Sequence, residues 1–450
     1  MLFFQMTNFF NNLFKNKFLI PVILLWLLVI TGYCLRTPHY CRAHDMGAHF
    51  EYTRYIAQMN KLPHPYAGYE TWQPPLYYLI NSFIDVPDLK SEVEKDKITH
   101  VNYGRGVSVL YGLIELLIIA WILSQVSQNQ ILQALVLMFI CTTPKFIFVF
   151  STYSNDSLTT LLSTAIVVLS YRLYTKWNNS LALALLSVST LGLYTKYTVL
   201  FPIAAVALIC LKNLLKLKLP NLVQTRIISI LILSLVLLSP YLYFHNYKNT
   251  GRLLSTSFNG EMDTTKFDVV QVKNLVGLVL RIPSWQINKV DYTHEWDEPW
   301  LHPWWYTVHP STKRYDYFSV SFVTSVIGEY LFNVPNVMFT WIIFFTHLIA
   351  YLIALKFAFK SNISKLSFLM LLIIHLFQIV SIPIFPTLPH RNMEYRYICW
   401  TWVCWAVLYI NSIEQKSILS NILIKAMFVG IIVQIYLLFT IEVESCFAVS

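Results

Sequence analysis

The stretch SLALALLSVSTLGLYTKYTVLFPIAAVALICL, Ser180 to Leu211, decides how this chain is arranged. It is an apolar run of 32 residues in which Lys196 is the only charge. A bilayer-spanning helix needs about 20 residues, so the run is too long for one span and short for two. A single span would put the basic cluster at 212–226 outside, whereas two short spans keep it in the cytoplasm, as the positive-inside rule prefers. We therefore predict two short helices with Lys196 at the outer tip.

The composition of the whole chain agrees with a membrane protein. Of 450 residues, 56% are hydrophobic and only 12% are charged, whereas a soluble domain carries about 25% charged residues. The formal net charge is +10, but Lys and Arg stand mostly at the ends of apolar runs, which is typical of topology signals. The basic balance therefore does not predict a nucleic-acid partner.

The N-terminus predicts an uncleaved signal anchor with its first residues in the cytoplasm, because Lys15 and Lys17 precede the apolar run 18–35 and no small-x-small site follows. From this start we predict a single all-α polytopic membrane domain, 1–450, with two ordered extracytoplasmic insertions, 36–105 and 245–335. The turn 386–396 also falls outside. About eleven transmembrane helices are expected, at 18–35, 106–124, 131–150, 157–175, 180–194, 198–212, 226–244, 336–355, 366–385, 397–412 and 419–441.

This topology gathers polar residues from five separate segments on the outer side. They are Asp45 and His49, Glu70 and Gln73, Asn155 and Asp156, Lys196, and Glu394 and Arg396. Charges at membrane depth are costly, so they pair with one another or line a wet cavity. Any one of them could be an interfacial residue or a structural ion pair. As a set on one face they favour a site, because the cytoplasmic face offers mainly topology lysines.

Two of these positions have competing interpretations. Asp45 and His49 are four residues apart and share a face if 43–59 is helical. That amphipathic run either lies flat on the outer surface, presenting Asp45 to a lipid head group, or is a solvated helix with an N-cap aspartate. Asp156 either orients a cation or sugar hydroxyl, or caps the fourth span.

At this point the chain resembles the GT-C glycosyltransferases, polytopic enzymes that use polyprenyl-phosphate sugars, such as the protein mannosyltransferases and the aminoarabinose lipid A transferases. HDMGAHFEYTRYIAQMNKLPHPYAGYETWQPPLYYLI (44–80) resembles their first outer loop. SNDSL (154–158), GLYTKYTVLFP (192–202) and EYRYICW (394–400) resemble later motifs in the same order. The resemblance covers about residues 18–410. Three features depart from the family: Met46 replaces a common Glu, Gln73 replaces a Lys before Pro-Pro, and ICWTW replaces a proline after Arg-Tyr.

The resemblance implies a GT-C fold with 36–105 as the outer catalytic loop. It implies a hexosyl- or pentosyltransferase that moves a sugar from a polyprenyl-phosphate donor to a lipid, glycan or protein acceptor, with inversion. Asp45 would be the general base, and Lys196 and Arg396 would hold the donor phosphate. The substrate-binding residues would be His49, Glu70, Gln73, Asn155, Asp156 and Glu394. The expected location is a bacterial inner membrane, with the site facing outward into the cell envelope. No cofactor is implied, and dependence on a divalent metal stays open.

Other functions remain open. A transporter or flippase of a lipid-linked or amphipathic solute would carry polar residues near the midplane and often repeated halves, whereas these charges cluster at outer ends and no repeat is evident. A non-catalytic assembly subunit would be signalled by loss of the base, and Asp45 is present. The tryptophan-rich stretch 283–310 favours an interfacial aromatic belt over a sugar pocket. Its acids and histidines match no standard metal spacing.

Overall fold

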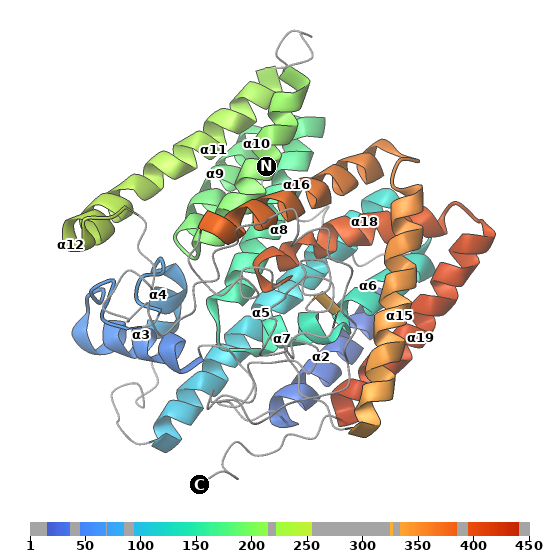
Figure 1. Ribbon diagram of the computed structural model, residues 1–450, viewed down its shortest axis with the longest axis horizontal. Coiled ribbons are helices and arrows are strands. Elements are labelled where there is room, and N and C mark those ends of the chain that lie inside the picture. The colour runs from blue at the N-terminus through green and yellow to red at the C-terminus, as the bar shows by residue number, and fades with distance from the viewer. Residues whose placement is uncertain are drawn as a thin grey trace. The chain divides into compact units, whose positions relative to one another are not determined.

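The computed structural model describes 16–36, 46–68, 70–84, 94–214, 222–253, 325–326, 334–384 and 395–440. Throughout these ranges the regular elements are helices, and no strand occurs among them (Figure 1). Several helices are apolar and long enough to cross a bilayer. The chain is therefore an all-α integral membrane protein, as the composition predicts.

Within the described ranges, five helical stretches have the length and hydropathy of a membrane span by themselves. They are Asn102–Val126, Asn155–Thr175, Leu222–Thr250, Asn362–Ile379 and Ile418–Thr440. A sixth candidate is the bent pair α6 (Gln130–Cys141) and α7 (Pro144–Ser151), whose axes differ by 65°. Shorter apolar helices occupy Leu19–Leu35, Asn179–Leu193, Tyr197–Leu211, Trp341–Phe357 and Ile398–Ile413. Every predicted span therefore coincides with an apolar helix or helix pair, while the number of crossings stays a prediction.

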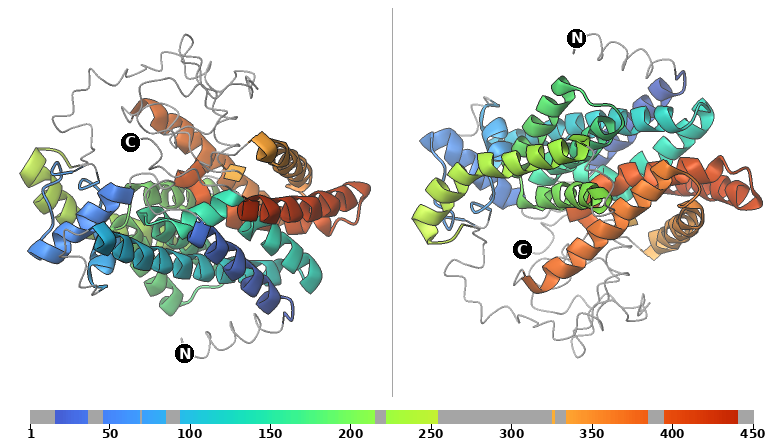
Figure 2. Two further views of the ribbon diagram at one scale, coloured as in Figure 1. Left: turned by 90° about the horizontal axis from the view of Figure 1, so that it is seen from below. Right: turned by 90° about the horizontal axis from the view of Figure 1, so that it is seen from above.

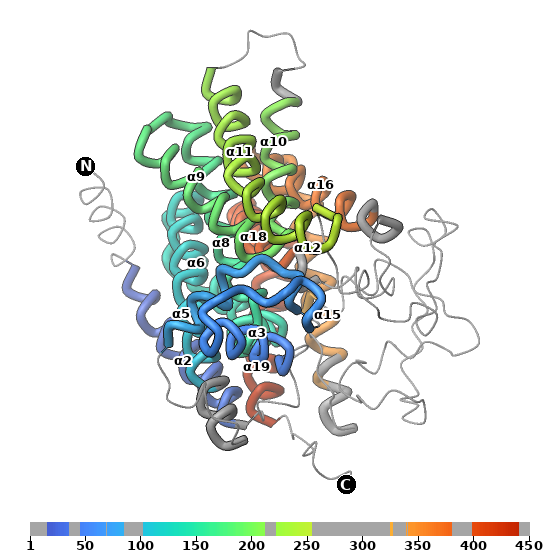
Figure 3. The backbone as a smooth tube through the Cα atoms, turned by 90° about the vertical axis from the view of Figure 1, so that its left-hand side faces the viewer, coloured from blue at the N-terminus to red at the C-terminus, as the bar shows by residue number. Residues whose placement is uncertain are grey.

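The chain divides into two compact units, which we describe separately. The first comprises the described parts of 45–118 and 152–262. It contains α3 (Met46–Met59), α4 (Leu76–Ser82), most of α5 (Glu94–Val126), α8 (Asn155–Thr175), α9 (Asn179–Leu193), η2 (Tyr197–Val199), α10 (Leu200–Leu214), α11 (Leu222–Tyr241), η3 (Leu242–Tyr247) and α12 (Lys248–Thr250). Within it, α9 packs against α8 and α11, and α10 packs against the same two helices (Figure 3).

The second unit comprises the described parts of 12–44, 119–151 and 263–450. Besides the end of α5, α6 and α7, it contains α2 (Leu19–Arg36), α15 (Val334–Phe357), α16 (Asn362–Ile384), η7 (Tyr395–Thr401), α18 (Trp402–Ile413) and α19 (Ile418–Thr440). The helices α15 and α19 pack along each other (Figure 2). Between them Gln434 bonds His347 at 2.6 Å and accepts a hydrogen bond from Thr142 at the α6–α7 bend, also at 2.6 Å.

The 180–211 run is broken, as its length and charge predict. The helix α9 ends at Leu193 and the chain resumes its helix at Tyr197, so Lys196 stands in the break. Because Lys196 contacts Asp156 in the first turn of α8, the end of α9 lies beside the start of α8. These two helices therefore run antiparallel, with the break at the end of the unit that carries the polar residues.

Polar pairs between α5 and α8 show that these two helices run parallel. The Ser157 hydroxyl donates to Ser108 at 3.1 Å, and the Thr164 hydroxyl donates to Glu115 at 2.7 Å. Seven residues separate the two pairs on each helix, which is about two helical turns. Residue numbers rise together along both helices from one pair to the next, so the two helices have the same chain direction. The start of α8 therefore lies at the N-terminal end of the apolar part of α5, as the predicted topology requires.

The helix α11 is interrupted near its end by Pro240 and continues as the π-helix η3. A proline has no N–H, so the carbonyl four residues earlier loses its usual donor. Here the Ser239 hydroxyl donates to that carbonyl, Val236 O, at 2.7 Å. The next carbonyl, Leu237 O, accepts from the Tyr194 hydroxyl at 3.0 Å. The Ser239 side chain thus replaces the missing backbone donor, and Tyr194 adds a second side-chain donor at the same bend, as expected where a membrane helix is broken.

Candidate functional site

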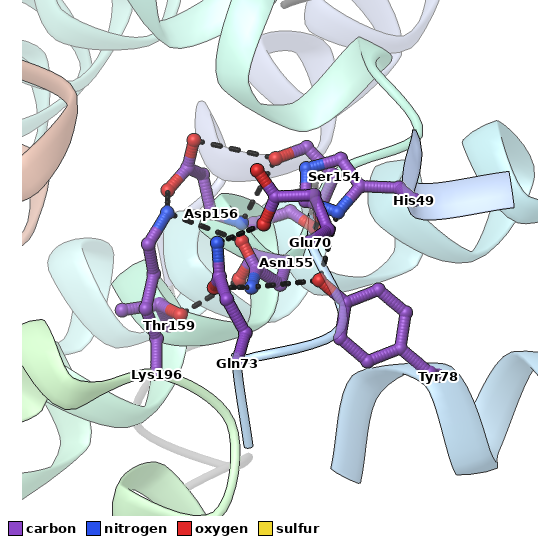
Figure 4. Close-up of polar contacts among 10 residues, drawn as sticks. His49, Glu70, Gln73, Tyr78, Ser154, Asn155, Asp156, Thr159 and Lys196 are labelled. Carbon is purple, nitrogen blue, oxygen red and sulfur yellow. Dashed lines mark hydrogen bonds and ion pairs between the residues drawn. The ribbon is translucent and has the colours of Figure 1, made fainter. Parts of the chain in front are cut away.

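The structure brings together the described members of the predicted outer constellation. Four segments of the first unit contribute them: α3, the loop before α4, the start of α8 and the break before η2. The residues are His49, Glu70, Gln73, Asn155, Asp156 and Lys196, and all six are buried (Figure 4). Asp45 and Glu394 lie outside the described residues, and of Arg396 only the backbone, within η7, is described.

The Pro74-Pro75 motif docks the loop before α4 onto the helices. Prolines donate no backbone hydrogen bond, so Leu76 carries the first N–H of α4. That N–H donates to the carbonyl of Tyr194, in the LYTK segment, at 2.8 Å. The carbonyl of Gln73 accepts from two tyrosine hydroxyls, Tyr52 of α3 and Tyr241 of α11, each at 3.2 Å. The loop is thereby held by three elements, and the Gln73 side chain is placed against α8.

A directed chain of hydrogen bonds links Lys196 to Glu70. The ammonium of Lys196 donates to Asn155 Oδ1 at 3.2 Å, and Asn155 Nδ2 donates to Gln73 Oε1. Gln73 Nε2 in turn donates to Glu70 Oε2 (Figure 4). A cation can only donate and a carboxylate can only accept, so the two ends fix the orientation of both amides. The network therefore joins a positive and a negative group through two neutral amides.

Lys196 also forms a buried ion pair with Asp156. Its Nζ lies 2.5 Å from Asp156 Oδ1, with the two side chains 9% and 10% exposed. Asp156 is in the first turn of α8, where the helix dipole favours a negative charge. The N-cap itself is Ser154, whose hydroxyl accepts from the Asp156 N–H at 3.2 Å. The capping interpretation of Asp156 is therefore wrong, and its carboxylate compensates the charge of Lys196.

His49 joins the network through Tyr78. Its Nδ1 lies 2.8 Å from the Tyr78 hydroxyl, which accepts from Asn155 Nδ2 at 3.3 Å. Either of the two atoms can be the donor in this contact, according to the tautomer of the histidine ring. Burial, with a further contribution from the Glu70 charge, raises the pKa of Tyr78 well above its usual value, so Tyr78 stays protonated.

Sequence reasoning missed several residues that hold the network or are charged and buried within an apolar run. Tyr52, Tyr78 and Tyr241 hold the network but look like ordinary interfacial aromatics in the sequence. Glu115 and Lys145 lie inside apolar runs, and both are fully buried. A single charge within a predicted span is by itself a signal of function, so these two could have been singled out.

The fold and the site together define an all-α integral membrane protein with a buried ionic and amide network at one end of its first unit. Comparison with known protein families, with curated proteins and with solved structures gives no match to this chain.

Proposed function

We propose that this chain is a membrane glycosyltransferase of the GT-C type, which transfers a sugar from a polyprenyl-phosphate donor to an acceptor hydroxyl outside the membrane. One observation carries the proposal. Residues from three of the separate motifs that resemble the family, 44–80, 154–158 and 192–202, meet in one buried network. Scattered interfacial charges would have no reason to converge in this way.

The reaction would be a single displacement. The acceptor oxygen attacks the anomeric carbon, the bond from that carbon to the phosphate oxygen breaks, and the phosphate leaves with the electron pair. Asp45 takes the proton of the acceptor hydroxyl as general base. Because Asp156 compensates much of the Lys196 charge, Arg396 would carry the larger share of phosphate binding, aided by its bidentate geometry.

The test is turnover of a radiolabelled polyprenyl-phosphate sugar by the purified chain in nanodiscs, with cell-envelope lipids and glycans supplied as acceptors. Asp45→Asn should abolish release of polyprenyl phosphate while the protein stays folded. Glu51→Gln is the matched control, because Glu51 is a half-exposed carboxylate of the same region, paired with Arg54 at 2.5 Å. Full turnover by the Asp45→Asn variant would show that Asp45 is not the general base. Absence of turnover by the unchanged chain would refute the proposed glycosyltransferase activity.

The proposed location is a bacterial inner membrane with the site facing outward, and surface labelling tests the orientation. Asn249, within α12, and Lys176, just after α8, are both exposed. In whole cells an impermeant thiol reagent should modify a cysteine at 249 but not one at 176. The reverse pattern would contradict an outward-facing site.

A second candidate is a transporter of a lipid-linked or amphipathic solute, and Glu115 favours it. This carboxyl lies near the middle of the apolar stretch Asn102–Val126 and is 0% exposed. Intramembrane carboxyls commonly belong to ion or proton pathways. Solute uptake into sealed vesicles, lost in Glu115→Gln without any donor consumption, would select this function over glycosyl transfer.

A further inference from the structure

Three buried polar atoms around the π-helix η3 have no hydrogen-bond partner among the described residues. They are Trp72 Nε1, His245 Nε2 and Asn246 Oδ1. An unsatisfied buried donor or acceptor costs about 1–3 kcal/mol, and native structures leave few of them. Short π-helical segments occur frequently at functional sites. Three such atoms beside one π-helix therefore need a physical reason.

The three residues belong to one aromatic cluster. The Trp72 ring stacks on Tyr197, with centroids 6.3 Å apart and planes 28° apart. Asn246 Nδ2 donates to the Tyr197 hydroxyl at 2.8 Å. His245 stacks on Tyr241 with centroids 5.0 Å apart. The cluster thus combines aromatic rings with polar side-chain atoms.

The hydrogen-bonding character of two of the three unsatisfied atoms is fixed. Asn246 Nδ2 also donates to the carbonyl of Leu253 at 2.9 Å. A carbonyl can only accept, so the amide cannot be flipped, and Oδ1 is an acceptor without a donor. Trp72 Nε1 can only donate. The cluster therefore offers at least one donor and one acceptor beside aromatic faces.

The cluster lies at the end of a helical stretch that is longer than a membrane span. Leu222–Thr250 has 29 residues, about nine more than a span needs, and η3 is part of its last third. Tyr243, Phe244 and Tyr247 on that end are exposed, as expected for an interfacial belt. The end of this helix also contacts the loop that carries Trp72, since His64 bonds the carbonyl of Asn249 at 3.3 Å (Figure 3).

We propose that Trp72, His245 and Asn246 form a saccharide subsite. A sugar presents apolar C–H faces that pack on aromatic rings and hydroxyls that both donate and accept hydrogen bonds. One hydroxyl would accept from Trp72 Nε1–H, and another would donate to Asn246 Oδ1. The subsite adjoins the buried network, because Tyr241 donates to the Gln73 carbonyl at 3.2 Å. The choice of a sugar rests on the proposed function, and the sugar could be part of the donor or of a glycan acceptor.

The experiment measures equilibrium binding to the full chain in nanodiscs by saturation-transfer NMR and calorimetry. The probes are a polyprenyl-phosphate sugar, polyprenyl phosphate without sugar, and free methyl glycosides. Trp72→Phe removes the donor and keeps a ring, while His245→Phe keeps the stack on Tyr241. Trp177→Phe is the matched control, because its indole N–H already donates to Asn179 Oδ1 at 2.8 Å. Thermal unfolding of each variant checks that it is folded.

Loss of one hydrogen bond should weaken sugar binding about five- to tenfold, with binding of sugar-free polyprenyl phosphate and of the control unchanged. A loss confined to the lipid-linked sugar identifies the donor, and a loss confined to free glycosides identifies the acceptor. Unchanged sugar affinity in both cluster variants, or equal losses for the sugar-free lipid, would overturn the subsite. The three unsatisfied atoms would then be explained by bound internal water or by ordinary packing. These binding measurements need no turnover. They can therefore refute the subsite without refuting the proposed transferase activity, and a failed turnover assay does not by itself refute the subsite.

Discussion

Removing the charge of Lys196 tests whether its ion pair is a buried, integral part of the network. The Nζ–Oδ1 distance of 2.5 Å corresponds to about 7 kcal/mol of attraction at an effective dielectric constant of 20, before desolvation is subtracted. Breaking a buried pair by removing one partner costs about 3–5 kcal/mol, because the remaining charge is left uncompensated. We therefore expect Lys196→Met to lower the free energy of unfolding by about 3–5 kcal/mol. The double variant with Asp156→Asn should recover about 2–3 kcal/mol of that loss.

The assay is reversible denaturant unfolding in mixed micelles, followed by circular dichroism. The pair formed by Glu51 and Arg54 is a matched control, because it has the same 2.5 Å separation but side chains that are 50% and 23% exposed. Arg54→Met should cost at most about 1 kcal/mol. The reasoning is refuted if Lys196→Met costs no more than Arg54→Met, or if the double variant is no more stable than Lys196→Met alone.

Three further outcomes follow from the described contacts. Gln73→Lys should lower the free energy of unfolding by about 1–3 kcal/mol, because lysine offers Asn155 Nδ2 no acceptor; wild-type stability in the same denaturant assay would contradict the directed chain. Glu115→Gln keeps an acceptor for Thr164 and should cost under about 1 kcal/mol, whereas Glu115→Ala should cost more than about 2 kcal/mol; equal costs would mean that the bond contributes nothing. The raised pKa of Tyr78 predicts stability that is constant below about pH 10 and falls above it, as the phenol ionises in the unfolded chain. Tyr78→Phe should reduce that alkaline loss in a pH series of unfolding curves, and an unchanged slope would count against the assignment.

Much of the fold follows from the sequence, because length and charge limit the choices. The break at Lys196 is predicted by an apolar run that no single span can contain. The prediction of one span at 131–150 is coarser than the structure, in which α6 and α7 are bent by 65° around Thr142 and Thr143. Pro144 at the start of α7 is the local cause that sequence reasoning passed over. The last part of the first predicted outer loop, 94–105, belongs to α5, which begins at Glu94 and not at 106.

The candidate site could be predicted as a set of residues but not as a set of pairings. Topology alone places Glu70, Asn155 and Lys196 on one side, since each follows or precedes an apolar run. Which atom donates to which depends on how α3, α8 and α9 pack, and no local pattern encodes that. The roles of Tyr52 and Tyr241 have the same origin, because a tyrosine near a span end is ordinary until a carbonyl is placed against its hydroxyl.

The amide at position 73 shows why the neutral residue suits this network. A lysine there, as in the family that the chain resembles, would pair with Glu70 but could not accept from Asn155 Nδ2. Gln73 both donates to Glu70 and accepts from Asn155, so it continues a polarised chain that a lysine would end. The positive end of that chain is Lys196 and the negative end is Glu70. Because Asp156 compensates much of the Lys196 charge, that end offers an anion little net attraction. The Glu70 carboxylate is expected to repel an anionic group from the Pro-Pro loop, the position at which the resembling family has its lysine.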